Sequence, residues 1–210
     1  MTNHHPPLDL AYVRAVTEAG YRGNVDAVLE ALSDADPRVR VAAAGAANRL
    51  GTLDGPTFMR LLEDSDVTVR RRAAALAARH DPQAAILSDL VNALLSRFAD
   101  EWSVAEMSAF ALGELGLANP EVTAALEHMA LRHADALCRE SAVAALGALG
   151  VGRATILAAL ADKAAIRRRA IIALASFEGA DIDAALALAL QDRDWQVRQA
   201  AEDLLTPPSD

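Results

Sequence analysis

Residues 192–205 of the chain read Asp-Arg-Asp-Trp-Gln-Val-Arg-Gln-Ala-Ala-Glu-Asp-Leu-Leu. This stretch joins a short acidic turn to a helix start and then to a helix rich in small residues. The same phrase occurs five more times upstream, each time around an apolar anchor residue that is usually followed by Arg. The six anchors, at intervals of 30, 35, 34, 28 and 31 residues, are Val39, Val69, Val104, Cys138, Ile166 and Val197. A repeat period of about 20–50 residues is typical of a solenoid.

The residues around each anchor predict a helix. An Asp stands three residues before the anchor in four copies, where it can accept hydrogen bonds from the free N–H groups of the first helical turn. These residues are Asp36, Asp66, Asp135 and Asp194, with Glu101 and Lys163 in the other two copies. Positions four, seven, eight and eleven after the anchor are mostly Ala and Leu, which places them on one helix face. Glycines then follow as helix C-termini prefer, at Gly51, Gly116 and Gly150.

Another apolar helix precedes every anchored helix, so each copy predicts a helical hairpin. The six hairpins are expected at about 24–51, 55–80, 84–116, 120–150, 153–178 and 181–205. Hairpins this rich in alanine cannot bury their apolar faces alone, so neighbours must stack. An amphipathic helix over 8–19, ending at Gly20, is expected to cap the exposed end of the stack. We therefore expect a disordered N-terminus at 1–7, a single repeat domain over 8–205 and a tail at 206–210.

The repeated phrase resembles HEAT repeats, in particular the short bacterial HEAT-like type found in phycobilin lyases. The matching residues are Leu-x-Asp-x-Asp-Pro-x-Val-Arg-x-Ala-Ala at 32–43, Leu-x-Asp-x-Asp-x-x-Val-Arg at 62–70 and Leu-x-Asp-x-Asp-Trp-x-Val-Arg at 190–198. The resemblance covers about residues 24–205. It implies an all-α fold, a right-handed α–α superhelix of about six hairpins, with the second helix of each hairpin on the concave face. Such folds carry unrelated functions.

The resemblance also implies ladders of hydrogen bonds between successive repeats, formed by the turn Asp and the Arg after the anchor. The matching pairs, six residues apart, are Asp34 with Arg40, Asp64 with Arg70, and Asp192 with Arg198.

Three copies depart from this ladder pattern. The fourth keeps Arg139 but has His133 in the Asp position. The fifth keeps Arg167 but has Ala161 there, with Asp162 one residue late. The third has Ala99 and Ala105 and is expected to lack both partners, which avoids leaving one buried charge unpaired.

Composition limits the class of function. The chain has 210 residues, a net charge of −9 and a pI near 5.0, whereas proteins that bind nucleic acid over their whole surface are normally basic. No apolar run is long enough to span a bilayer, and the first residues lack the features of a signal peptide. We therefore expect a cytoplasmic protein with no membrane segment and no nucleic-acid partner. The single cysteine, Cys138, is interpreted as a small buried hydrophobe.

No catalytic or metal site is evident in the sequence. His128 and His133 would lie about 140° apart on one helix, which is poor geometry for shared metal ligation. The iron-binding HEAT hydroxylases use repeated His-Glu pairs, whereas this chain has only Glu127-His128 in the reversed order. We expect no cofactor and no catalytic residue.

Charges at matched repeat positions suggest a binding surface on the second helices. Basic residues flank an acidic middle: the basic candidates are Arg71, Arg72, Arg79 and Arg168, and the acidic ones are Glu106, Glu114 and Glu140. The alternative is that these charges are solvated and keep the protein soluble.

Two tryptophans, Trp102 and Trp195, stand two residues before their anchors. This equivalence favours a packing role at the hairpin turn. Trp102 also lies in the divergent third copy, near Met107 and Phe110. If exposed, these three side chains would form an interface anchor.

Three functions remain open. The first, which we favour, is an adaptor that binds an unidentified protein or peptide on its concave face. The second is a HEAT-like lyase or chaperone subunit that handles a cofactor or tetrapyrrole, which bound pigment would support. The third is a HEAT-like DNA-binding protein similar to the alkylpurine glycosylases. That class needs a basic groove with an aromatic residue and a carboxylate, for which the only candidates are 70–72, Trp102 and Glu101 or Glu106.

Overall fold

Helical hairpins form where the sequence alternates an apolar helix with an anchored one. The computed structural model describes residues 10–79 and 84–206, so the expectations for 1–7 and for most of the tail lie outside the described residues. Within those ranges the regular structure is entirely helical. The first helices of the hairpins are α2 (Val25–Ala31), α4 (Gly55–Leu62), α6 (Ala84–Ser96), α8 (Pro120–Arg132), α10 (Arg153–Ala159) and α12 (Ala180–Ala189). The second helices are α3 (Pro37–Leu50), α5 (Val67–Ala77), α7 (Trp102–Glu114), α9 (Ala136–Leu149), α11 (Ala164–Ala173) and α13 (Trp195–Leu205).

The predicted N-terminal capping helix is α1 (Leu10–Arg22), and it packs against α2 and α3. The expectation that Gly20 ends this helix is wrong. Gly20 is buried inside α1, where a Cβ atom would lie 2.7 Å from Cβ of Ala46. The glycine serves close helix contact here, not termination.

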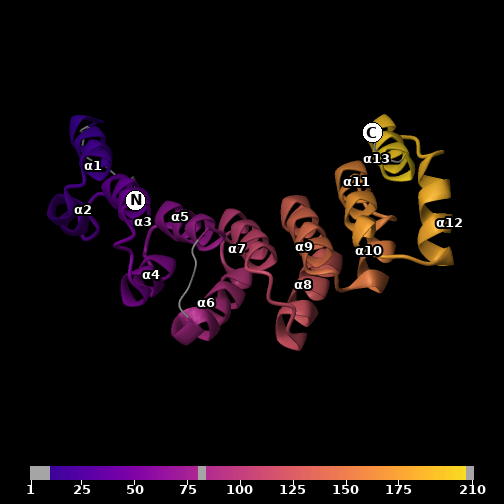
Figure 1. The fold of residues 1–210 in the computed structure, drawn as a ribbon, viewed down its shortest axis with the longest axis horizontal. Coiled ribbons are helices and arrows are strands. Elements are labelled where there is room, and N and C mark those ends of the chain that lie inside the picture. The colour runs from indigo at the N-terminus through magenta and orange to yellow at the C-terminus, as the bar shows by residue number, and fades with distance from the viewer. Residues whose placement is uncertain (1–9, 80–83, 207–210) are drawn as a thin grey trace.

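The hairpins stack into an arch with two layers (Figure 1). Neighbouring second helices pack along their lengths, and α1 continues their row, whereas first helices of adjacent repeats touch little. The arch bends toward the more closely packed layer, so the second helices line its concave side, which is the upper side in Figure 1. This arrangement is an α-solenoid.

Small residues allow the second helices to approach each other closely. Ala43 and Ala142, at the predicted buried position of their copies, are completely buried. At Gly113 a Cβ atom would lie 2.9 Å from Cα of Ala145, and at Gly147 it would lie 2.8 Å from Cα of Ala173. Backbone therefore meets backbone at these crossings, and the helix spacing leaves no room for one methyl group.

The helix ends follow the sequence signals. The side chains of Asp36, Asp66, Asp135 and Asp194 each accept a hydrogen bond from the backbone N–H two residues later. Gly51, Gly116 and Gly150 have φ angles of 66°, 70° and 66°, in the left-handed region that glycine adopts at no steric cost.

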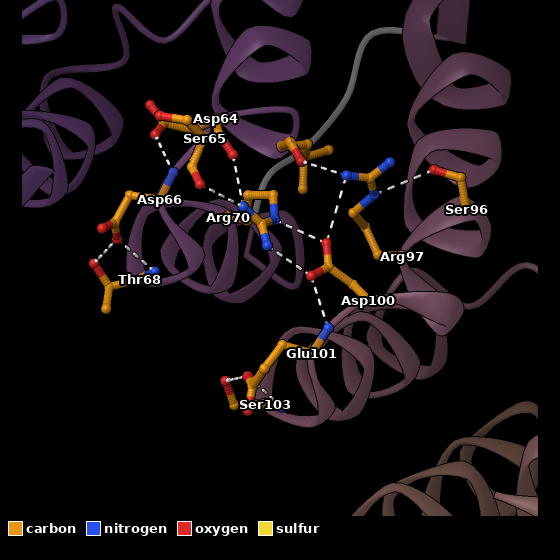
Figure 2. A network of polar contacts seen from close by, with 11 residues as sticks. Asp64, Ser65, Asp66, Thr68, Arg70, Ser96, Arg97, Asp100, Glu101 and Ser103 are labelled. Atoms are coloured by element: carbon orange, nitrogen blue, oxygen red, sulfur yellow. Dashed lines mark hydrogen bonds and ion pairs between the residues drawn. The ribbon is translucent and has the colours of Figure 1, made fainter. Parts of the chain in front are cut away.

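At most junctions, an arginine side chain that forms hydrogen bonds in two directions joins one repeat to the next. Arg70 donates from Nε and Nη2 to the carboxylate of Asp100 at 2.8 and 2.7 Å, and from Nη1 to the carbonyl oxygens of Asp64 and Ser65 at 2.8 and 3.1 Å (Figure 2). One guanidinium thus holds the turn of its own repeat through the backbone and the turn of the following repeat through a charged side chain.

The same two-sided arginine contact occurs at four junctions between successive repeats in the described part of the chain. The donor and carboxylate residues are Arg40 with Asp64, Arg70 with Asp100, Arg139 with Asp162, and Arg167 with Asp192. The pairs expected from the sequence, with Asp and Arg six residues apart, are not ion-paired in this way. In each of them the Arg contacts only the backbone carbonyl of the Asp, as Arg40 does at Asp34. Arg198 likewise donates to the carbonyl of Asp192.

The expectation that the third copy lacks its carboxylate is wrong. Asp100, one residue after Ala99, receives Arg70 and also accepts the backbone N–H of Glu101. Asp162 does the same for Arg139 and the N–H of Lys163. A carboxylate four residues before the anchor therefore reaches the same backbone N–H as one five residues before it.

One link is absent, between the third and fourth repeats, because Ala105 offers no guanidinium. His133 fills the turn instead, with Nδ1 accepting the N–H of Asp135. Here α7 and α9 form the most extensive helix contact in the described chain. The hydroxyl of Ser141 also donates to the carbonyl of Glu106 at 2.9 Å. Backbone approach and a neutral hydrogen bond thus replace the ion pair.

The contacts with arginine change the pKa values of the aspartates that they hold. The hydrogen bond from Arg70 lowers the pKa of Asp100, and the bond from Arg167 lowers the pKa of Asp192. For Asp64, burial is the largest influence and raises the pKa, but the hydrogen bonds from Arg40 and from the N–H of Asp66, with the charges of Arg40 and Arg70, outweigh it, so the net shift is downward. The folded protein therefore favours ionised aspartates at these positions.

We expect Gly147→Ala to destabilise the protein by about 1–3 kcal/mol, because the added methyl group overpacks the α9–α11 crossing. In an exposed helix the same substitution stabilises by about 1 kcal/mol. The sign of the change in the free energy of urea-induced unfolding therefore distinguishes a tight crossing from an open one. A more stable variant would show that the crossing has room for the methyl group.

We expect Arg167→Met to cost about 2–4 kcal/mol, because it leaves the carboxylate of Asp192 without its partner. Arg198→Met is the matched control, since Arg198 occupies the same repeat position but its one hydrogen bond to the described residues is to the carbonyl of Asp192; we expect a cost of about 1 kcal/mol. Equal losses in chemical denaturation would contradict a dominant role for the bond between repeats.

We expect stability to fall as the pH drops below about 4. The aspartate pKa in the unfolded chain is about 3.9 and the folded values lie lower, so the unfolded state binds more protons as acid is added. The contribution is therefore present above the unfolded pKa and is lost as pH falls through the folded values. Urea unfolding of the wild type and of Asp192→Asn should differ less at pH 3 than at pH 7. A constant difference would refute the linkage.

Candidate functional site

The concave face consists of matched rows of side chains on the second helices. Each row holds the residues two before the anchor and two and six after it, which are four residues apart and therefore lie on one side of the helix; where the second helix is long enough, as in α7, the residue ten after the anchor continues the row. Two grooves lie between such rows. One is lined by residues of α3 and α5, and the other by residues of α11 and α13. These rows, not the anchors, meet solvent on the inside of the arch.

The two arginine triplets divide their members among different contacts. Arg70 and Arg167, the first of each triplet, form the links between repeats. Arg71 and Arg168, the second, belong to the concave rows and line the two grooves. The third member differs between the triplets: Arg72 lies in the α3–α5 groove, whereas Arg169 forms an ion pair.

The acidic middle of the face interacts with the basic residues that flank it. Glu106 is partly buried, and this burial raises its pKa, an effect that Arg71 opposes and Glu140 reinforces. Glu140 in turn pairs with Arg169 of α11 at 3.5 Å. Arg71, Glu106, Glu140 and Arg169 thus form a line of interacting charges across α5, α7, α9 and α11.

Trp102, Glu106, Phe110 and Glu114 form the row on α7. The prediction that the tryptophans pack at the hairpin turns is wrong, because Trp102 is 46% exposed and Trp195 is 64% exposed. Both are the first residue of their helix. Phe110 is 42% exposed, while Met107 is partly buried against the core. Two aromatic side chains therefore alternate with two carboxylates on the inner face.

A second apolar patch was missed in the sequence. Ile172 and Leu204 are exposed and line the α11–α13 groove with Trp195 and Arg168, around a volume of about 220 Å³. Ile172 stands six residues after its anchor, as Phe110 does. This shared repeat position could have identified Ile172 as an exposed apolar residue from the sequence.

The single cysteine of the chain lies in the core. Cys138 is buried, donates from Sγ to the carbonyl of Trp102 at 3.2 Å, and has its pKa raised to about 11, chiefly by burial. A thiol with this pKa is almost fully protonated near neutral pH, which fits a packing role. Across 10–79 and 84–206, no three His, Cys, Asp or Glu side chains gather as metal ligands would. In the same ranges, every helix is too short or too polar to cross a bilayer.

Comparison with known proteins agrees with this architecture. The sequence model of HEAT repeats matches residues 2–79 and 55–147. The X-ray structure of YibA from Escherichia coli is similar with a TM-score of 0.68 at 15% identity, covering 98% of this chain and 77% of that one. Human deoxyhypusine hydroxylase aligns with a TM-score of 0.46 at 21% identity, covering 93% of this chain and 78% of that one. Among curated protein sequences, none matches. The family model covers more than half of the chain, and the chain therefore belongs to the HEAT-repeat family.

Proposed function

We propose that this protein is a non-catalytic scaffold that binds a protein or peptide segment along its concave face. The observation that carries the proposal is the row of Trp102, Glu106, Phe110 and Glu114 on α7. Large aromatic side chains exposed on the inner face of an arch are placed where a bound segment can cover them. A solenoid of this kind supplies an extended concave surface for the remainder of the segment.

The aromatic side chains would supply most of the affinity. Trp is enriched among the few residues that dominate binding energy, because it buries a large apolar area at little conformational cost. The surrounding charges would mainly orient the partner and speed its association, since exposed pairs are weak and screened by salt. The basic and acidic residues on either side of Trp102 would in this way select the direction of the bound chain.

A protein partner fits this surface better than a nucleic acid. Glu106 and Glu114 share the row with the exposed aromatic residues, so a phosphate backbone laid against Trp102 would meet two carboxylates. The net charge of −9 acts in the same direction at longer range. The shared surface therefore supports the adaptor function over the glycosylase-like one.

The test uses peptides selected from a display library against the full chain, with affinities measured by fluorescence anisotropy. We expect Trp102→Ala to weaken binding about 10- to 100-fold, the range of hot-spot losses of roughly 1.5–3 kcal/mol. Leu131→Ala is the control, because Leu131 is an equally exposed apolar residue on α8 in the outer layer. If Leu131→Ala abolishes binding and Trp102→Ala does not, the partner occupies the convex side.

A further inference from the structure

An open groove between α3 and α5 is lined by several arginine side chains and by no acidic side chain. It encloses about 420 Å³ and is lined by Arg49, Arg71 and Arg72, with the hydroxyl-bearing Thr17 and Thr68 at its sides. Arg79, on the same row as Arg71, is close enough to lower the pKa of Arg72. Four guanidinium groups therefore converge on one side of a protein whose net charge is −9.

Arg72 is the distinctive member of this cluster. Its guanidinium lies against the backbone of α3 at Gly45, where a Cβ atom would stand 2.5 Å from Nη2. Its Nε is buried and donates no hydrogen bond within the described residues. A buried N–H group without an acceptor is unfavourable, so a small shift of the Arg72 side chain toward an oxygen acceptor in the groove would be favoured.

The other arginines of the groove differ from those that link the repeats. Within the described part of the chain, Arg49, Arg72 and Arg79 form no ion pair, whereas each linking arginine holds a carboxylate. Arg49 is positioned by an aromatic ring, with its guanidinium carbon 4.1 Å from the ring centroid of Tyr21. The pKa of Arg72 is lowered by burial first and then by the charges of Arg49 and Arg79. A bound anion would relieve this repulsion.

We propose that the α3–α5 groove binds an oxyanion group, a carboxylate or a phosphate, carried by the segment that occupies the concave face. The carrier rests on the proposed function, and the anion site itself rests on Arg72, Arg49 and Arg71. Arg72 supplies its unpaired Nε–H, and the other two supply neutralising charge and forked hydrogen bonds. Both oxyanions present the same oxygen geometry to a guanidinium.

The neighbouring helix limits the size of the ligand. Glu106 lies near enough to Arg71 for the two charges to interact, and Glu114 follows on the same row of α7. An anionic chain longer than the groove would meet these carboxylates within the screening length of about 8–10 Å. A compact group with one or two negative charges therefore fits the site, and an extended polyanion does not.

The test is an NMR titration of the full ¹⁵N-labelled chain with inorganic phosphate and, separately, with acetate, at ionic strength held constant with chloride. We expect a saturable shift of the Nε–Hε resonance of Arg72. Arg72→Gln should bind the effective anion at least ten-fold more weakly, followed through the amides of 41–45. Arg49→Gln tests the site in a second way, because Arg49 is exposed and its loss leaves the core unchanged. Arg132→Gln, exposed on α8, is the charge-matched control.

Saturable binding of phosphate alone identifies a phosphorylated side chain as the carrier group, and binding of acetate identifies an acidic one. The proposal is overturned if neither anion shifts these resonances beyond the chloride reference, or if Arg132→Gln weakens binding as much as Arg72→Gln and Arg49→Gln. Because no peptide is present, these outcomes do not depend on the peptide measurements with Trp102→Ala, so the anion site and the scaffold function can fail separately.

Discussion

The fold depends on a repeated contact in which the guanidinium of one arginine joins the turns of two neighbouring repeats. In each link the Arg after the anchor holds backbone carbonyls of its own repeat and the carboxylate of the next, as Arg70 does between Asp64 and Asp100. Since a hairpin with an alanine-rich face has no core of its own, its position is set by its neighbours. The fork fixes both distance and orientation, because two parallel hydrogen bonds permit less rotation than one.

The missing link at Ala105 shows what else can hold repeats together. The third and fourth repeats join through close contact of α7 and α9, with Gly113 against the backbone of Ala145 and Ser141 bonded to the carbonyl of Glu106. This is also the region where aromatic residues appear on the inner face. Packing maintains the stack there, so the row on α7 can carry Trp102 and Phe110 without disturbing the links on either side.

Repetition gives each position in the unit a constant environment. The anchor is buried, the next residue reaches the following turn, and the residue after that faces the concave side. Two adjacent arginines can therefore do unrelated work: Arg70 maintains the stack, while Arg71 lies on the surface beside Glu106. The proposed binding of a peptide and of its anionic group uses only positions that the links between repeats leave free.

The sequence by itself determined the helices, their order and most of their ends, although α1 continues past Gly20. The anchor period, the caps at Asp36 and its equivalents, and the glycines after the second helices depend on local backbone chemistry, which spacing along one chain expresses directly. Only the tertiary structure decided which groups meet across repeats. Asp100 serves Arg70 although it stands one residue late, because both aspartate positions reach the same backbone N–H. Trp102 is exposed at the start of α7, and Arg72 enters the groove because its neighbouring helix has glycine at position 45. Contacts of long side chains depend on the distance and the crossing angle between two helices. The spacing of residues along the chain does not determine either quantity.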